Sequence, residues 1–439
     1  MKPNVLLIIL DTLRKDVLEV YGGSAKTPNL KALLTDAILY KNAVAPAPWT
    51  TPSHVSLFTG LYPSEHGVHE KVEKQMHSIK ISMENNNLEI ERLSDILLNK
   101  GYTTSAISNN PNISQVSGMD RGFQSFVFSD QFDFVSPQYK EVINNIIKLR
   151  GAGSKKLKII FNFLKGGGLF KLGRYYLIKR ILDYPLDKGG TVTVAMFKNE
   201  DLFQPFFKFI NFIDAHEPYT GVDSIDFEKN QVGLLKFNKS KTNRLRRQYS
   251  LEAEFLDSKI GEIIKSLKSK GLYDNTLIII TSDHGQALNE HGFVGHGIFL
   301  SKEIIEIPLI IKYPHQKKFT EKTGYQNLVN IKKLILDVIE GGDDSSLTTE
   351  TTFSESYGLV DPIRTPYLSS TDYVMSHMQK LRKAVFKNGF KLNVNGTDGL
   401  IEEFTKDGKD VDPNDYKKEF EDLKNELEIF AGSKSFKLP

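Results

Sequence analysis

Three aspartates each stand where an apolar run of the chain ends. Asp11, Asp214 and Asp283 each stand at or just past the end of such a run, and His284 follows Asp283 directly. One aspartate in this place is usually a helix cap or a turn residue, but three in the same relation favour a common site. Two carboxylates and an imidazole from separate strand ends suit Zn²⁺, Mn²⁺, Mg²⁺ or Ca²⁺. The residue types therefore predict a divalent-metal site.

A hydroxyl is expected beside this site. Thr50 and Thr51 precede Pro52, which is a typical helix start, and Thr59-Gly60 would end a short helix. The positive end of a helix attracts an anionic substrate. A threonine hydroxyl is a weak nucleophile by itself, but metal coordination can activate it. The local sequence alone leaves open that Thr50 or Thr51 is only an N-cap.

Histidines gather in the same polar segments. Five of the ten lie there: His54, His216, His284, His291 and His296. Imidazoles at such a site can bind substrate oxygens or protonate a leaving group. Any one of them alone could equally be a structural residue whose ring nitrogens are hydrogen-bonded.

Alternating strands and helices must position these groups. Continuous apolar runs predict buried strands, and amphipathic segments after Thr27-Pro28 and further along predict helices. The expected strands are Val5–Leu10, Thr103–Ser108, Phe206–Ile213 and Thr276–Thr281, and the longer expected helices are Leu88–Lys100 and Leu251–Lys270. This alternation predicts an α/β fold with a mostly parallel central sheet between two helical layers. Ligands of such sheets bind at the carboxyl ends of the strands.

The pattern changes near residue 343. Residues 343–352 are polar and are expected to form a loop, Asn388-Gly389 predicts a hairpin, and Asp412-Pro413 is expected to start a final amphipathic helix. We therefore expect a catalytic α/β domain over 1–342 and a small α+β subdomain over 343–439 packed on it.

Composition excludes several classes of protein. The 439 residues contain no cysteine, so disulfides, thiolate metal sites and cysteine nucleophiles are excluded. The formal net charge of +3 gives no reason to expect nucleic acid as a partner. Neither a signal peptide nor a membrane-spanning segment is evident, so the sequence predicts a cytoplasmic protein.

One local segment is strongly basic. Residues 148–180 contain ten lysines and arginines and no acidic residue, with apolar and aromatic residues between them. We expect it to belong to an insertion covering about 145–190. It could pack on the domain as a solvated hairpin, make a peripheral contact with an anionic membrane, or form a lid that draws in an anionic substrate.

The motifs occur together in a familiar order. They are Asp11-Thr12-Leu13-Arg14, Thr27-Pro28-Asn29-Leu30, Ala47-Pro48-Trp49-Thr50-Thr51-Pro52-Ser53-His54, Thr59-Gly60-Leu61-Tyr62-Pro63, His66-Gly67-Val68, Asp214-Ala215-His216-Glu217-Pro218-Tyr219, Ser282-Asp283-His284-Gly285 and Gly295-His296-Gly297. With these motifs the chain resembles the sulfatase family of the alkaline phosphatase superfamily. The resemblance covers most of the chain and implies a mixed, mostly parallel sheet sandwiched by helices, with a small C-terminal subdomain.

The resemblance also implies roles for single residues. By position, Asp11, Asp283 and His284 match ligands of one divalent metal ion, taken here as Zn, Mn or Ca, and Thr50 matches the nucleophile that shares the metal.

Three histidines correspond to site positions of the family. His216 matches a substrate-binding histidine, His54 falls where sulfatases carry an arginine, and His296 falls near the usual lysine.

The departures from the family pattern concern the chemistry. Sulfatases of this type need Cys or Ser at position 50, which is converted to formylglycine, and Thr50 does not permit that conversion. Threonine is the nucleophile in branches resembling phosphodiesterases, phosphonate hydrolases and phosphoethanolamine or phosphoglycerol transferases. Thr12 replaces an acidic or amide ligand. Two-metal members need a histidine at position 218, where this chain has Pro218.

These points favour a metal-dependent hydrolase of phosphate or sulfate esters that works through a covalent Thr50 intermediate. Its partner would be an anionic ester, with a glycan or lipid-linked substrate as candidates, and not nucleic acid. The alternatives are a phosphotransferase of the phosphoethanolamine or phosphoglycerol type and a catalytically inactive binding protein.

Overall fold

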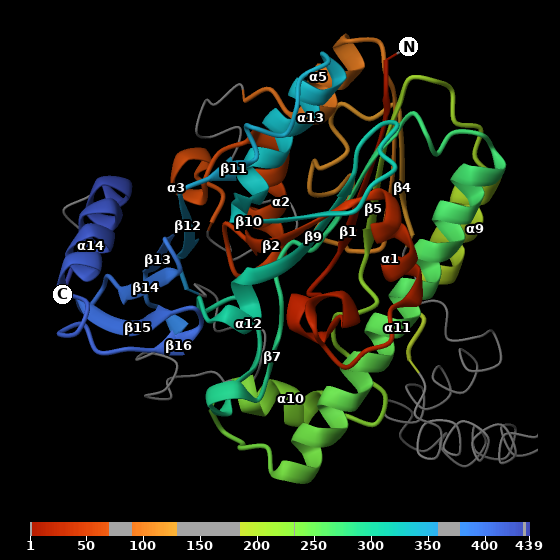
Figure 1. Cartoon of the computed structure of the whole chain (residues 1–439). Helices are drawn as coiled ribbons and strands as arrows, with labels where there is room; N and C mark the ends of the chain where they lie inside the picture. Colours follow the sequence, from red (N-terminus) through yellow and green to blue (C-terminus); the bar gives the residue numbers. More distant parts are fainter. Residues whose placement is uncertain (1, 70–89, 130–184, 232, 359–377, 433–435) are drawn as a thin grey trace, which may run out of the picture.

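The computed structural model describes residues 2–69, 90–129, 185–231, 233–358, 378–432 and 436–439. The basic segment 148–180 lies outside these residues. The described helices and strands form one large sheet with helices on both faces and a smaller sheet at the C-terminal end, as Figure 1 shows. The prediction of a mixed, mostly parallel α/β fold with a small C-terminal α+β part is confirmed.

The large sheet has nine strands in the order β11-β10-β2-β9-β6-β1-β5-β3-β4. Neighbouring strands from β6 to β4 run parallel, whereas β9 is antiparallel to both β2 and β6. Its strands are β1 Asn4–Leu10, β2 Ile38–Val44, β3 Thr103–Ser108, β4 Ser125–Phe128, β5 Phe206–Phe212, β6 Thr276–Thr281, β9 Glu306–Lys312, β10 Thr320–Asn327 and β11 Thr348–Thr349. The carboxyl ends of β1, β5 and β6 therefore meet at one edge of the sheet.

Strand β1 shows why helices must cover both faces. All seven of its residues are buried. Alternate side chains, such as those of Leu7 and Leu6, belong to two different hydrophobic clusters. One cluster includes residues of α2 Thr50–Thr59, α5 Leu93–Asn99 and α13 Ile331–Ile339. The other includes residues of α1 Pro28–Leu33, α9 Gly190–Asn199 and α11 Lys239–Ser269.

The small sheet is antiparallel throughout, with the order β12-β13-β14-β15-β16. Its strands are β12 Thr351–Ser356, β13 Arg382–Lys387, β14 Phe390–Asn395, β15 Leu400–Lys406 and β16 Lys409–Asp410. Helix α14, Lys417–Ala431, packs on it through Leu423 and Leu427. The hairpin expected at Asn388-Gly389 is confirmed as the turn between β13 and β14.

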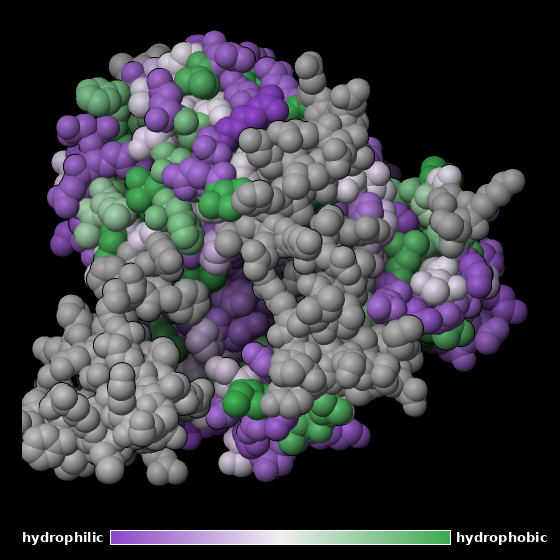
Figure 2. Space-filling model, turned by 180° about the vertical axis from the view of Figure 1, so that it is seen from behind, coloured by the Kyte–Doolittle hydropathy of each residue, from purple (hydrophilic) through white to green (hydrophobic). Residues whose placement is uncertain are grey.

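The remaining elements are short. Besides short 3-10 helices, they are α3 Pro63–His66, α10 Ser224–Gln231, α12 Lys302–Ile305 and the hairpin of β7 Ala287–Leu288 with β8 Val294–Gly295. Within the described ranges, no helix is both long and apolar enough to cross a membrane. The face shown in Figure 2 carries hydrophilic and hydrophobic side chains intermixed, with a hydrophilic hollow near the centre of the view.

Several predicted boundaries were wrong. The long helix α11 begins at Lys239 instead of Leu251, because the Asn238 side chain accepts a hydrogen bond from the Lys241 N–H and caps a polar first segment. The last helix begins at Lys417, after the turn that follows Asp412-Pro413.

Two further predicted segments also differ. The helix α5 begins at Leu93, where Asp95 caps the Arg92 N–H. Residues 343–352 are not only a loop, because they contain β11 and the start of β12.

Candidate active site

The carboxyl ends of β1 and β6 bring the predicted metal ligands together. Asp11 follows β1, and Asp283 and His284 follow β6, and all three are fully buried. One ligand atom from each lies within 4.8 Å of the other two. His284 Nε2 is 3.4 Å from Asp283 Oδ2 and 4.0 Å from Asp11 Oδ1.

The hydrogen bonds leave specific atoms facing one another. Asp11 Oδ2 accepts from the Asn110 amide, and Asp283 Oδ1 accepts from the backbone N–H groups of Thr12 and His284. The other oxygens, Asp11 Oδ1 and Asp283 Oδ2, are buried without a hydrogen-bond partner. His284 Nδ1 donates to the Gly285 carbonyl, so its Nε2 carries a lone pair. Orphaned buried oxygens beside an imidazole lone pair are what a cation site requires.

The charges and pKa directions of the site also favour a bound cation. Burial raises the pKa of Asp11 well above its usual value, and the nearby Asp283 raises it further. Burial lowers the pKa of both His54 and His284, so neither supplies a positive charge near neutral pH. In the described part of the chain, His54 and His284 are the only basic side chains within ion-pair distance of the two carboxylates. A divalent cation fits this uncompensated negative charge.

Thr50 is the first residue of α2 and is 3% exposed. Its Oγ1 is 3.3 Å from His284 Nε2. The ten-residue helix directs its positive end toward the hydroxyl, which is a suitable place for the anionic part of an ester. The structure thus brings Thr50 together with all three predicted metal ligands.

His54 lies one turn further along α2 and is buried. Its Nδ1 donates to the Thr50 carbonyl over 2.9 Å, and its Nε2 accepts from the Asn211 amide over 3.2 Å. Both ring nitrogens are therefore bonded within the protein, next to Asp283.

His216 and His296 stand on the partly exposed side of His284. The ring centroids of His216 and His296 are 5.0 Å apart, and those of His284 and His296 are 4.5 Å apart. Glu217 and Gln286 complete this group, because the Gln286 amide donates to Glu217 Oε2 and its carbonyl oxygen accepts from His296 Nδ1.

Asp214 follows β5 as expected but does not join the metal ligands. Its Oδ1 accepts from the backbone N–H groups of Lys188 and Gly190, at the start of α9. Thr12 also contributes no side-chain oxygen, since its hydroxyl donates to the Asp11 carbonyl. Its φ of 61° lies in the left-handed region, which is unusual for a β-branched residue.

Sequence reasoning missed Asn110 and Gln286. Asn110 comes just after β3, so the strand-end argument that selected the aspartates could have found it. Gln286 follows the Ser282–Gly285 motif directly, but an isolated glutamine carries no pattern of its own.

The loops of the site are fastened to the small sheet. The Glu355 N–H donates to the Pro46 carbonyl, and the Ser356 hydroxyl donates to the Ile298 carbonyl. The Gly297 N–H donates to the Pro48 carbonyl, which joins the His296 loop to the residues before Thr50.

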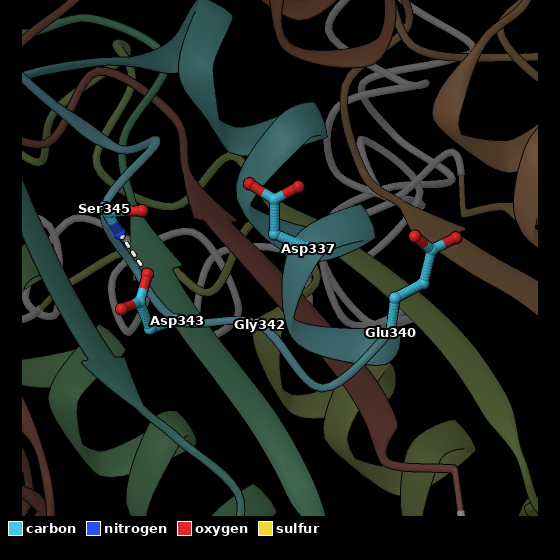
Figure 3. A pocket seen from close by; sticks show the side chains of 5 residues that line it. All are labelled: Asp337, Glu340, Gly342, Asp343 and Ser345. Carbon is cyan, nitrogen blue, oxygen red and sulfur yellow. Dashed lines mark hydrogen bonds between the residues drawn. The ribbon is translucent and has the colours of Figure 1, made fainter.

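A separate acidic cavity lies elsewhere (Figure 3). It encloses about 390 Å³ and is lined by Asp337, Glu340, Gly342, Asp343 and Ser345. Glu340 pairs with Lys100, whose carbonyl accepts from Lys2 just before β1. The cavity therefore lies near the amino end of β1, away from Asp11, and its acidic lining does not suit an anionic ester.

Comparison with known proteins agrees with this geometry. The Sulfatase family profile matches residues 3–341. The chain belongs to the sulfatase family. Choline-sulfatase of Rhizobium meliloti is 25% identical over 316 residues, which are 66% of this chain and 59% of that protein. The multifunctional alkaline phosphatase superfamily protein PehA of Trinickia caryophylli is 24% identical over 398 residues, 77% of this chain and 74% of that protein.

Solved structures share the fold. The phosphonate monoester hydrolase SpPMH of Silicibacter pomeroyi superposes with a TM-score of 0.66 at 18% identity, covering 98% of this chain and 94% of that chain. BT4656, in complex with its substrate D-glucosamine-2-N,6-O-disulfate, gives a TM-score of 0.64 at 16% identity, covering 98% and 97%. The sulfatase family thus places the chain among ester hydrolases of the alkaline phosphatase superfamily, which typically use a divalent metal.

Proposed function

We propose that the protein is a metal-dependent hydrolase of phosphate or sulfate esters with Thr50 as its covalent nucleophile. The observation that carries the proposal is the position of Thr50 Oγ1, 3.3 Å from His284 Nε2, beside Asp11 and Asp283. Asp11, Asp283, His284 and Thr50 would hold one divalent ion, with Zn, Mn or Ca as candidates. When bound, the ion would lower the pKa of the threonine hydroxyl and offset negative charge on the ester.

In the first step, Thr50 Oγ1 would form a bond to the phosphorus or sulfur atom while the bond to the leaving oxygen breaks. The hydroxyl proton is lost from Thr50, and a proton must reach the leaving oxygen. Water would then hydrolyse the threonyl ester and restore the hydroxyl. No formylglycine is involved, because Thr50 cannot form one.

We assign His216 and His296 to the substrate side of the site. Both are partly exposed and lie beside His284, which suits contact with the remaining ester oxygens or protonation of the leaving group. We assign His54 to positioning, because its Nδ1–H holds the Thr50 carbonyl and its Nε2 is engaged by Asn211.

Phosphoryl chemistry is favoured over sulfuryl chemistry because residue 50 is threonine. Thr50 together with a histidine at position 296 also fits a phosphotransferase of the phosphoethanolamine or phosphoglycerol type. An inactive binding protein is disfavoured, because Asp11, Asp283, His284 and Thr50 lie together at one strand edge.

The substrate is proposed to be an anionic ester on a glycan or a lipid-linked molecule. BT4656 was solved with a sulfated glucosamine, and another structural relative, Ps i-CgsB, with k-i-k-neocarrahexaose. A cytoplasmic location and a peripheral membrane contact through residues 148–180 stay predictions from the sequence.

The test compares wild type, Thr50→Ala and Thr50→Ser on aryl phosphate monoesters, phosphodiesters, phosphonates and sulfates, each with several metals. We expect Thr50→Ala to keep its metal and lose at least about a thousandfold in kcat/KM, because a missing nucleophile removes the covalent step. Thr50→Ser should retain part of the activity. Activity of Thr50→Ala within tenfold of wild type would contradict the proposal.

A further inference from the structure

Thr12, the residue directly after the proposed ligand Asp11, has an unusual backbone conformation. Its φ is 61°, and the residue is fully buried. Among the described residues, the other non-glycine positions with positive φ are occupied by asparagine, histidine or aspartate. Those side chains tolerate the left-handed region, whereas the branched Cβ of threonine is strained there. Other contacts must therefore hold Thr12 in this conformation.

The conformation of Thr12 places its backbone N–H at the buried site. The N–H donates to Asp283 Oδ1 over 3.1 Å, and the His284 N–H donates to the same oxygen over 2.9 Å. Because both donors occupy Oδ1, the oxygen that stays without a hydrogen-bond partner is Oδ2, 3.4 Å from His284 Nε2. The Thr12 hydroxyl donates instead to the Asp11 carbonyl. The contribution of Thr12 to the site is thus its N–H, which selects the carboxylate oxygen that is left for a cation.

Tyr249, on α11, bonds to the backbone on the other side of the Thr12 Cα. Its hydroxyl donates to the Thr12 carbonyl over 2.6 Å and accepts from the Arg14 N–H over 2.8 Å. The side chain is fully buried, and burial raises the pKa of Tyr249, so the hydroxyl keeps its proton and can make both bonds. Thr12 is therefore held at its N–H by Asp283 and at its carbonyl by Tyr249.

Backbone groups do not duplicate these two bonds of Tyr249. Within the described residues, no backbone N–H donates to the Thr12 carbonyl, and no backbone carbonyl accepts from the Arg14 N–H. Without the tyrosine hydroxyl both buried groups would lack a partner, which is unfavourable. A rotation of Thr12 to negative φ would relieve its strain, and it would turn the Thr12 N–H away from Asp283. The position of this N–H at the site therefore depends on the Tyr249 hydroxyl.

We propose that Tyr249 is a positioning residue of the buried site: its hydroxyl holds Thr12 in the left-handed conformation, and the Thr12 N–H then directs Asp283 Oδ2 toward the cation. The inference rests on the proposed function, because it needs a divalent cation bound by Asp11, Asp283 and His284. The hydroxyl of Tyr249 is bonded to the backbone of residues 12 and 14, so its effect on the cation passes through this backbone.

The experiment is a calorimetric titration of chelator-treated protein with Mn²⁺. Tyr249→Phe removes only the hydroxyl and should raise the Mn²⁺ dissociation constant at least about tenfold, as expected for a group that orients a metal ligand. Thr12→Gly should bind within about threefold of wild type, because glycine adopts positive φ without strain. For the same reason, adding Tyr249→Phe to Thr12→Gly should weaken binding by less than about threefold.

Tyr102→Phe is the matched control. Tyr102 is also buried, and its hydroxyl also donates to a backbone carbonyl, that of Pro3, but it does so just before β1, at the opposite edge of the sheet. The control should bind Mn²⁺ as wild type does, even if both tyrosine variants lose thermal stability. Near-ultraviolet circular dichroism checks that each variant is folded. If Tyr249→Phe does not fold by itself, the comparison in the Thr12→Gly background decides.

Tyr249→Phe that binds Mn²⁺ as tightly as Tyr102→Phe would overturn the positioning role and leave the proposed function standing. A loss of tenfold or more when Tyr249→Phe is added to Thr12→Gly would also overturn it, because the effect would then not depend on the strain at Thr12. A wild-type protein that binds none of the divalent metals would contradict the proposed function, and the role of Tyr249 with it.

Discussion

Two buried pairs of carboxylates lie near the same edge of the large sheet, and the protein treats them differently. Each pair keeps two oxygens without a hydrogen-bond partner, but Asp11 and Asp283 have only neutral imidazoles nearby. Asp214 and Glu252 instead have Lys188, whose Nζ is 3.2 Å from Glu252 and donates to the Asp214 carbonyl.

The difference separates a site from a structural cluster. Where the chain supplies its own cation, the carboxylates hold the 186–190 segment in place through backbone N–H groups. Where no lysine or arginine is supplied, the divalent cation that we propose would compensate the buried negative charge. The contrast favours Asp11 and Asp283 as the functional pair, although Asp214 also follows a strand.

The largest effect is expected from a change in Asp11 and Asp283, the pair of carboxylates that lacks its own cation. Asp283→Asn should lose the metal of the buried site and at least about a thousandfold in kcat/KM, because it removes one of two ligand carboxylates. Asp214→Asn is the control and should keep that metal. Metal analysis and steady-state kinetics on both variants check this. Equal metal loss in the two variants would erase the distinction between the pairs.

The next largest effect is expected when Asp214 and Glu252 lose the lysine beside them. Lys188→Met should lower the free energy of unfolding by about 3–5 kcal/mol, because it leaves Glu252 buried without its counter-charge. Lys198→Met, which breaks an exposed pair with Glu262, should cost less than about 1 kcal/mol. Urea unfolding of both variants measures the two costs. A Lys188→Met cost no greater than the control would argue against an internal counter-ion.

Removing the metal should have an intermediate effect on stability. A cation present at a hundred times its dissociation constant stabilises the folded state by about 2.7 kcal/mol, so a chelator should lower the melting temperature of wild type. The chelator should have a smaller effect on Asp283→Asn. Thermal unfolding with and without chelator provides the measurement, and identical shifts in both proteins would contradict it.

The smallest effect concerns pH. Burial, only partly opposed by Lys188, raises the pKa of Glu252 to about 7 and that of Asp214 to about 6. At these two groups the folded state then holds more protons than the unfolded chain, so their contribution to stability is greatest below about pH 4 and is lost as pH rises toward 7. Glu252→Gln should flatten this fall by about 1–3 kcal/mol. Unfolding curves from pH 4 to 8 provide the test, and an unchanged slope would count against it.

The same contrast shows what the sequence could predict. Asp11, Asp283 and His284 follow apolar strands, and Thr50 starts a helix, so local pattern and family resemblance together selected residues that the fold does assemble. Strand β10 was not predicted because its residues Thr320–Asn327 are mostly polar and partly exposed. Lys188 and Glu252 are 64 residues apart, and only the fold pairs them.

The contacts of β12 have a consequence for building hybrid enzymes. One strand of the small sheet holds the backbone before Thr50 and the backbone after His296, through Glu355 and Ser356. Exchanging the small sheet between family members would therefore change the backbone contacts of both loops at once. A chimera that keeps its activity should inherit residues 45–49 and 296–298 from the same parent as β12.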